Sequence, residues 1–152
     1  MKTSNGRTIL YVEDDPVVRA AYGNRLREEG FQVEPAQDGL EAMRLLLGLT
    51  PDLVVLDLML PKFTGEDVLK FIHSQPRLKS VRVIVLSTNS IVDATQEAVL
   101  ERADRRMLKG SCTFPMILQA VHDVLAGTPD KPQVYKLDRQ DGKLVKLDTV
   151  AA

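Results

Sequence analysis

Two runs of nearly continuous Val, Ile and Leu constrain the fold of this chain more than any other feature. They cover residues 53–57 and 81–87. Strands that are apolar on both faces are typical of a parallel sheet that helices cover on both sides. Further strand patterns occur at residues 8–12 and 31–35 and, more weakly, at 105–108. The sequence therefore predicts five strands in a buried parallel sheet.

Amphipathic stretches separate these strands. Three of them repeat apolar residues at helical spacing: Val18, Ala21, Tyr22 and Leu26; Ala42, Leu45, Leu46 and Leu49; and Phe114, Ile117, Leu118, Val121, Val124 and Leu125. Gly30 is expected to end the first helix. Two more helices are expected, over 65–75 and over 92–102, and the second has a thin apolar face. Five βα units in this order predict a doubly wound α/β fold, because right-handed crossovers place helices on both faces of the sheet.

The chain changes character after Leu125. The segment AGTPDKPQ carries one Gly and two Pro and is predicted to be a linker, so one domain is expected over 7–126 and an extension over 127–152. Two arms of alternating apolar residues flank Asp141-Gly142, which predicts a β-hairpin in this extension. An isolated hairpin is marginally stable, so we expect it to pack against the domain or a second copy of the chain, which would make a homodimer. The alternative is that the extension is disordered.

Composition argues against several classes of function. A net charge of −1 with 27% charged residues indicates neither nucleic acid nor an anionic membrane as a partner. The extension is also too short for a DNA-binding module, and its charges alternate in sign. The single cysteine, Cys112, and the absence of an apolar signal-peptide segment predict a cytoplasmic location. No apolar stretch approaches the roughly 18 residues that a membrane span needs.

Polar residues follow or end four of the predicted strands. Glu13 and Asp14 follow the first strand, Asp57 ends the third, Ser87 ends the fourth and Lys109 follows the fifth. Ligands of doubly wound sheets bind at this edge. The three acids would repel one another unless a cation lay among them, and an all-oxygen site suits Mg²⁺. Asp57 is then a candidate nucleophile for a phosphoryl group, whose oxygens Mg²⁺, Lys109 and Ser87 would stabilise.

Four segments resemble the receiver domain of two-component response regulators, in particular the single-domain form like the chemotaxis regulator. They are ILYVEDDP (9–16), VVLDLMLPKFTGEDVL (54–69), VIVLS (83–87) and MLK (107–109). The resemblance covers 7–126 and implies a flavodoxin-like (βα)₅ fold with strand order 2-1-3-4-5. It also implies phosphorylation of Asp57 by a histidine kinase or phosphotransfer protein. In such domains Mg²⁺ is held by the equivalents of Asp14, Asp57 and the Met59 carbonyl, with Glu13 acting through water.

Three positions depart from the family pattern. Gly110 replaces the proline that usually follows the lysine, so glycine's conformational freedom is expected to make this turn. Thr88 replaces a small residue and would narrow access to the phosphoryl site. Arg106 replaces an aromatic residue that moves inward in the family, and we expect it to stay outside because burying an unpaired guanidinium is costly. With Arg102 and Arg105 it would form a basic face that suits an acidic output protein or a partner subunit.

The sequence leaves two functions open and disfavours a third. The first is a phosphorylatable receiver that signals by protein contact. The second is a receiver-like interaction module with phosphorylation-independent output, which the three departures favour. A phosphohydrolase with an Asp57 nucleophile would need a general acid two residues later, and Met59 cannot transfer a proton. The chain is therefore not expected to be an enzyme.

Overall fold

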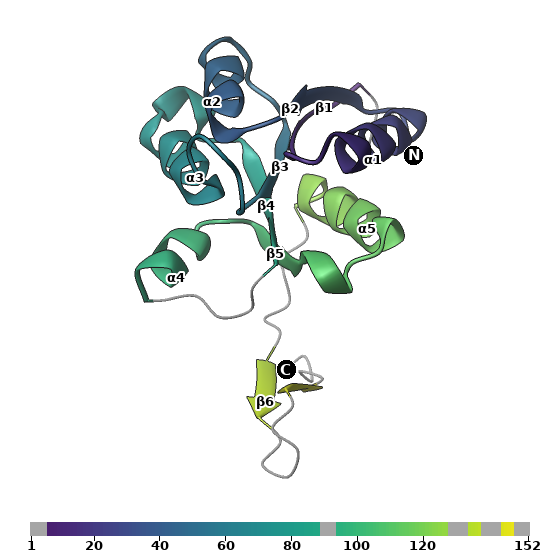
Figure 1. Ribbon diagram of the computed structural model, residues 1–152, viewed down its shortest axis with the longest axis vertical. Coiled ribbons are helices and arrows are strands. Elements are labelled where there is room, and N and C mark those ends of the chain that lie inside the picture. Colours follow the sequence, from purple (N-terminus) through teal and green to yellow (C-terminus); the bar gives the residue numbers. More distant parts are fainter. Residues whose placement is uncertain (1–5, 89–93, 128–133, 138–143, 148–152) are drawn as a thin grey trace.

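The structure is a computed structural model that describes residues 6–88, 94–127, 134–137 and 144–147. Its strands are β1 (Thr8–Val12), β2 (Gln32–Ala36), β3 (Leu53–Asp57), β4 (Arg82–Ser87), β5 (Arg105–Leu108), β6 (Val134–Leu137) and β7 (Leu144–Leu147). Its helices are α1 (Pro16–Glu28), α2 (Gly39–Gly48), α3 (Gly65–Ser74), α4 (Ala94–Leu100) and α5 (Phe114–Leu125), with short 3₁₀ turns at Pro76–Leu78 and Lys109–Ser111. Strands β1 to β5 form one parallel sheet in the order β2-β1-β3-β4-β5 (Figure 1).

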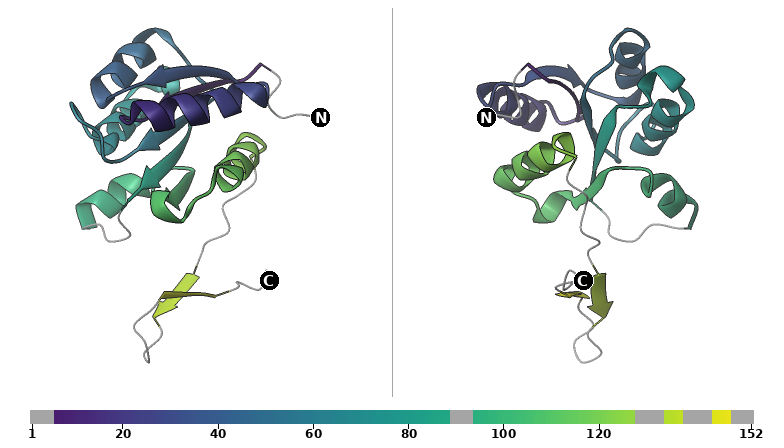
Figure 2. Two further views of the ribbon diagram at one scale, coloured as in Figure 1. Left: turned by 45° about the vertical axis from the view of Figure 1, so that its right-hand side comes forward. Right: turned by 180° about the vertical axis from the view of Figure 1, so that it is seen from behind.

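Helices cover both faces of this sheet, as the two views of Figure 2 show. Helices α1 and α5 pack on one face, and α2, α3 and α4 pack on the other. Side chains that alternate along a strand point to opposite faces. Ile9 and Tyr11 of β1 therefore enter the core under α1 and α5, whereas Leu10 and Val12 enter the core under the other three helices. The predicted doubly wound fold and its strand order are confirmed.

Side-chain caps fix where α1 and α3 begin. The carboxylate of Asp15 accepts hydrogen bonds from the backbone N–H groups of Val17 and Val18 at the start of α1. At the start of α3, Thr64 and Asp67 form a reciprocal capping box. Helix α1 ends where predicted, because Gly30 follows its C-cap residue with a left-handed φ of 99°.

The boundaries of several elements differ from those predicted. Strand β2 begins and ends one residue later than expected, and α4 spans Ala94–Leu100 rather than 92–102. Its one buried residue, Leu100, agrees with the thin apolar face. Strands β6 and β7 pair in antiparallel fashion, as expected of a hairpin. The Asp141-Gly142 turn and most of the predicted linker lie outside the described residues. Among the helices that the structure describes, none is long and apolar enough to cross a membrane.

Candidate functional site

The central strand β3 carries Asp57 to the carboxyl edge of the sheet, between β1 and β4. Asp57 pairs with Leu86 of β4, so that Ser87 at the end of β4 lies one residue further on. Glu13 follows β1, the strand on the other side of β3. Parallel pairing thus brings to one edge the polar residues that the sequence placed at the strand ends.

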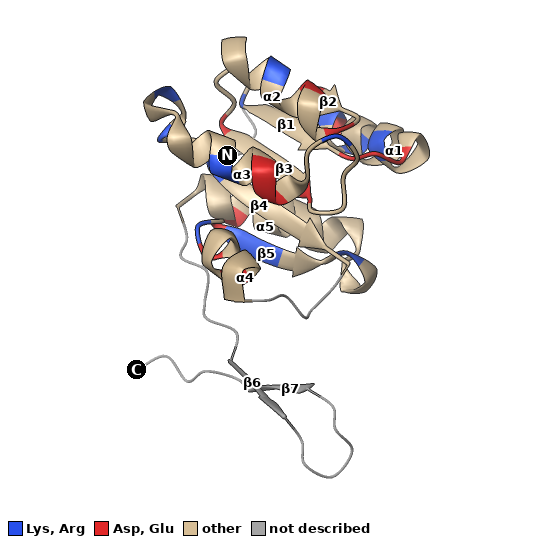
Figure 3. Ribbon diagram, turned by 60° about the vertical axis from the view of Figure 1, so that its left-hand side comes forward, with Lys and Arg blue, Asp and Glu red and all other residues tan. Residues whose placement is uncertain are grey.

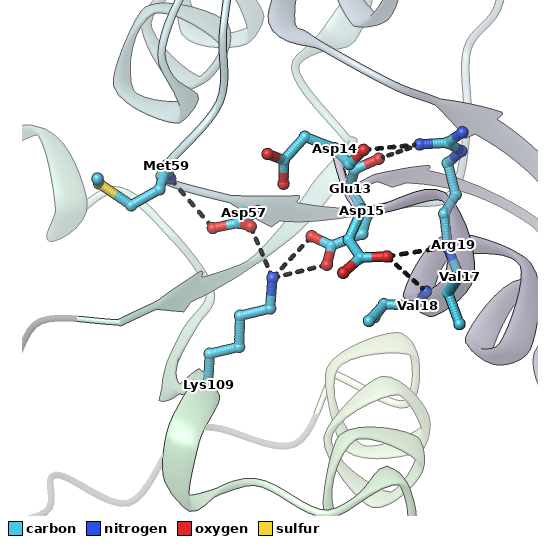
Figure 4. A network of polar contacts seen from close by, with 9 residues as sticks. All are labelled: Glu13, Asp14, Asp15, Val17, Val18, Arg19, Asp57, Met59 and Lys109. Carbon is cyan, nitrogen blue, oxygen red and sulfur yellow. Dashed lines mark hydrogen bonds and ion pairs between the residues drawn. The ribbon is translucent and has the colours of Figure 1, made fainter.

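Lys109 bridges two buried carboxylates at this edge (Figure 4). Its Nζ donates to both carboxylate oxygens of Glu13, at 2.7 and 2.8 Å, and to Oδ2 of Asp57 at 2.8 Å. Glu13 and Asp57 are only 1% and 2% exposed. Because an unpaired buried charge is costly, the ammonium group is the cationic partner that Asp57 requires in an otherwise apolar strand.

Burial and the ion pairs have opposite effects on the pKa values of Glu13 and Lys109. Burial is the main cause that raises the pKa of Glu13 to about 7, helped by Asp57 and opposed by Lys109. Burial also disfavours the charged form of Lys109, but the hydrogen bonds and charges of Asp57 and Glu13 outweigh it and raise the lysine pKa. Lys109 is therefore a lasting positive charge at neutral pH, whereas the charge of Glu13 changes near neutrality.

Asp14 completes a cluster of three carboxylates. One oxygen from each of Glu13, Asp14 and Asp57 lies within 4.8 Å of the others, and Asp14 is exposed whereas the other two are buried. When all three acids are ionised, the cluster with the Lys109 ammonium has a formal charge of −2 (−3 + 1). Clustered carboxylate oxygens that open to solvent on one side are the donors that Mg²⁺ prefers, because Mg²⁺ keeps several waters. The donor set therefore fits the predicted Mg²⁺ ion.

The backbone after Asp57 is held closely against the strand. The N–H group of Met59 donates to Oδ1 of Asp57 at 3.0 Å, while the Met59 side chain is 65% exposed. A Cβ atom on Gly65 would lie only 2.4 Å from the Asp57 carbonyl oxygen, so α3 begins in contact with the strand end. Lys62 and Phe63 lie between Met59 and Gly65 in the sequence. They have left-handed φ angles of 48° and 74°, which non-glycine residues rarely adopt. The Met59 N–H group thus fixes the Asp57 carboxylate from the loop side, and Gly65 lets α3 begin close to the backbone of the strand end.

Sequence reasoning missed Arg19 of α1. Its Nη1 donates to the backbone carbonyls of Glu13 at 2.7 Å and Asp14 at 3.3 Å (Figure 4). The third acid of the run, Asp15, caps α1 and has no direct part in the carboxylate cluster. The sequence did offer a signal for this role. Arg19 is an arginine close to the N-terminus of a helix, where the helix dipole disfavours positive charge, so a specific contact is needed to explain it.

The turn after Lys109 contradicts one expectation. Residues Lys109–Ser111 form a 3₁₀ turn, and Gly110 has no left-handed φ. A Cβ atom on Gly110 would meet nothing within 4 Å, and no cis peptide bond occurs among the described residues. The prediction that this turn depends on glycine's freedom was therefore wrong, since a 3₁₀ turn suits ordinary residues. Ser87 is half-buried at its strand end, and Thr88 next to it is exposed.

The arginines of β5 pair with acids on the two neighbouring helices. Arg106 donates through Nη1 and Nη2 to the two carboxylate oxygens of Glu97 on α4, at 2.6 and 3.1 Å. Arg105 lies 3.3 Å from Oδ2 of Asp123 on α5. Arg106 therefore stays outside the core, as predicted. Figure 3 shows β5 as a basic strand beside α4, but these pairs neutralise much of that charge within the chain.

Comparison with known sequences identifies relatives over most of the chain. The sequence model of the response regulator receiver domain matches residues 9–122. The gliding motility regulatory protein of Myxococcus xanthus is 31% identical over 113 residues, which are 74% of this chain and 14% of that protein. The DNA-binding dual master transcriptional regulator RpaA of Synechocystis is 35% identical over 128 residues, which are 84% of this chain and 53% of RpaA. The chain thus spans about half or less of the length of these relatives.

Solved structures with a similar fold include receiver domains and a response regulator. A receiver domain of a signal transduction histidine kinase from Syntrophus aciditrophicus has a TM-score of 0.70 at 27% identity, covering 85% of this chain and 97% of its own. The response regulator TrrA from Thermotoga maritima, solved in complex with Mg²⁺-BeF, has a TM-score of 0.68 at 28% identity, with coverage of 78% and 98%. Sequence, fold and acidic site together show that this chain belongs to the response regulator receiver family, the signalling modules of two-component systems.

Proposed function

We propose that the chain accepts a phosphoryl group on Asp57 from a histidine kinase or phosphotransfer protein and signals by protein contact. The observation that carries the proposal is the buried Asp57 carboxylate, which is fixed between the Lys109 ammonium and the Met59 N–H group. A carboxylate oriented from both sides, next to Glu13 and Asp14, is arranged for nucleophilic attack on phosphorus.

In the proposed transfer, an oxygen of Asp57 forms a bond to phosphorus while the P–N bond to the donor's imidazole breaks. The imidazole nitrogen keeps the bonding electron pair and takes up a proton. Lys109 compensates charge on the phosphoryl oxygens, and the Ser87 hydroxyl donates a hydrogen bond to one of them. Glu13, Asp14, Asp57 and the Met59 carbonyl would hold Mg²⁺, which when bound supplies further positive charge. The Mg²⁺-BeF complex of the relative TrrA supports this assignment.

The first prediction is that acetyl phosphate with Mg²⁺ adds one phosphoryl group to the protein, as measured by intact mass. The added mass should be absent in Asp57→Asn and after chelation of Mg²⁺. Asp15→Asn is the matched control, because it removes a neighbouring charge but keeps an oxygen that can cap α1. Phosphorylation of Asp57→Asn, or its loss in Asp15→Asn to the same degree, would contradict the assignment of Asp57.

A second candidate is the receiver-like module whose output does not depend on phosphorylation. The observation that favours it is the ion pair between Arg106 and Glu97, which ties α4 to β5 where the family usually has a mobile aromatic side chain. Phosphorylation of Asp57 with unchanged binding of the output protein would support this candidate over the first.

The partners and domain limits form part of the same proposal. We infer a receiver unit over 7–126 and an extension over 127–152, which carries β6 and β7. Since Arg105 and Arg106 are paired internally, the exposed Arg102 is the arginine of this face best placed for an acidic partner or a second copy of the chain.

A further inference from the structure

We propose that Arg19 is a positioning residue of the metal site, an inference that rests on the proposed function. Its guanidinium reaches back from α1 to two successive backbone carbonyls, those of Glu13 and Asp14. These two residues carry two of the three clustered carboxylates. Arg19 would touch neither the ion nor the phosphoryl group, and it would act by fixing the backbone from which the acids project.

The loop between β1 and α1 is held from three directions. The Glu13 N–H group donates to the Ala36 carbonyl of β2 at 3.0 Å, so the amide side of this residue is anchored to the sheet. Arg19 anchors its carbonyl side at 2.7 Å and the next carbonyl at 3.3 Å. Asp15, the next residue, is tied to the first turn of α1 because its carboxylate accepts from the N–H groups of Val17 and Val18. Without Arg19, the carbonyls of residues 13 and 14 lose the donor that ties them to α1.

The position of Arg19 is electrostatically unfavourable in other respects. A positive charge near a helix N-terminus opposes the helix dipole, and a cation close to a metal site repels the metal. The guanidinium offsets these costs because its Nη1 carries two N–H donors, and it donates to both neighbouring carbonyl oxygens, at 2.7 and 3.3 Å. Lys109 already holds the Glu13 and Asp57 carboxylates together, but the exposed Asp14 carboxylate would otherwise move away from them to relieve repulsion before an ion binds. Arg19 thus preorganises the acids, as outer partners of metal ligands commonly do.

The test is a Mg²⁺ titration of the full chain, followed by the amide NMR signals of Asp57 and Met59. Arg19→Gln should weaken Mg²⁺ binding about tenfold, the lower end of the range for lost outer partners. Coulomb's law alone predicts tighter Mg²⁺ binding by Arg19→Gln, because this change removes a cation. Arg19→Lys should restore part of the affinity, since one donor can still reach a carbonyl.

Arg27→Gln is the matched control. Arg27 lies on the same helix and donates to the Val33 carbonyl at 3.1 Å, so the change removes the same charge and a similar contact away from the acids. Its Mg²⁺ affinity should equal that of the unaltered protein. Asp14→Asn provides the reference for loss of a direct ligand.

Each outcome separates the two proposals. If Arg19→Gln binds Mg²⁺ as tightly as the unaltered protein, or if Arg27→Gln weakens binding equally, the role of Arg19 is refuted and the proposed function stands. If the unaltered protein shows no Mg²⁺-dependent shifts, the metal site of the proposed function fails as well. Should Arg19→Gln not fold, Arg19→Lys decides: affinity equal to that of the unaltered protein would show that the contact of the guanidinium with both carbonyls is not needed.

Discussion

Two glycines near the site have opposite surroundings, and the difference shows which backbone contacts the site depends on. Gly65 begins α3 against the end of β3, and an added Cβ would lie 2.4 Å from the Asp57 carbonyl oxygen and 2.7 Å from Cα of Leu58. Gly110 follows Lys109 in an open turn, where an added Cβ meets nothing within 4 Å. The close approach behind Asp57 therefore requires glycine, and the turn after Lys109 does not.

We predict that Gly65→Ala destabilises the protein by about 1–3 kcal/mol, the usual cost of forcing a methyl group into a packed site. It should also slow phosphorylation of Asp57, because either the strand end or α3 must shift. Gly110→Ala is the control and should change stability by less than about 0.5 kcal/mol. Thermal unfolding and acetyl phosphate labelling measure both effects. Equal stability of the two variants would contradict the close packing at Gly65.

Sequence reasoning was effective for site residues whose position follows from strand periodicity. Asp57 could be predicted because it ends an apolar strand, and Lys109 because it follows the weaker strand pattern at residues 105–108; parallel strands end at one edge. It did not predict that Lys109 is shared with Glu13, or that Arg19 holds two carbonyls. These contacts depend on where long flexible side chains meet across elements, and the local pattern does not encode that.

Strand β5 lies at the edge of the sheet and connects two helices through adjacent residues. Arg106 pairs with Glu97 of α4 and Arg105 pairs with Asp123 of α5, because successive strand side chains point to opposite faces. The five parallel strands were predictable from the βα alternation, and their order was predictable from the family resemblance. The extent of α4 was not, because its thin apolar face gives a weak helical signal.

The ion pair between Arg106 and Glu97 predicts a pH-dependent contribution to stability. Arg106 lowers the pKa of Glu97 from its usual value of 4.5. A depressed folded-state pKa adds stability that is present above pH 4.5 and is lost as the pH falls through the folded-state pKa. Glu97→Gln should therefore cost about 0.5–1 kcal/mol at pH 7, a value at the upper end for exposed pairs because the contact is bidentate.

Thermal unfolding at a series of pH values measures this contribution. The difference in Tm between Glu97→Gln and the unaltered protein should narrow below pH 4.5. Glu101→Gln, at an exposed acid just after α4, is the control and should leave Tm nearly unchanged. A Tm difference for Glu97→Gln that stays constant down to pH 3 would contradict a role for the ionised pair.

The described residues form two separate sheets. The parallel sheet of β1–β5 carries the site, whereas β6 and β7 form their own antiparallel pair. A two-stranded sheet is marginally stable alone in water. We therefore expect β6 and β7 to gain stability from the receiver unit or from a second copy of the chain.

Deleting residues 131–152 tests this expectation. If the strands pack on the receiver unit, Tm should fall by a few degrees, which corresponds to about 1 kcal/mol for a chain of this size. If they pack on a second copy, the mass in solution should drop from dimer to monomer. Replacing the same residues with a Gly/Ser segment of equal length controls for chain length. Unchanged Tm and mass would show that the extension contributes to neither.

The bridge made by Lys109 also bears on how the protein reaches its native state. The lysine lies 96 residues after Glu13 and 52 residues after Asp57, so the contact closes two long loops. Closing such loops costs chain entropy, and long-range contacts of this kind form late in folding. During synthesis, the two acids leave the ribosome well before the lysine does. A nascent chain would hold its acids without their shared cation, and competence for phosphorylation would arrive only with the last strand of the sheet.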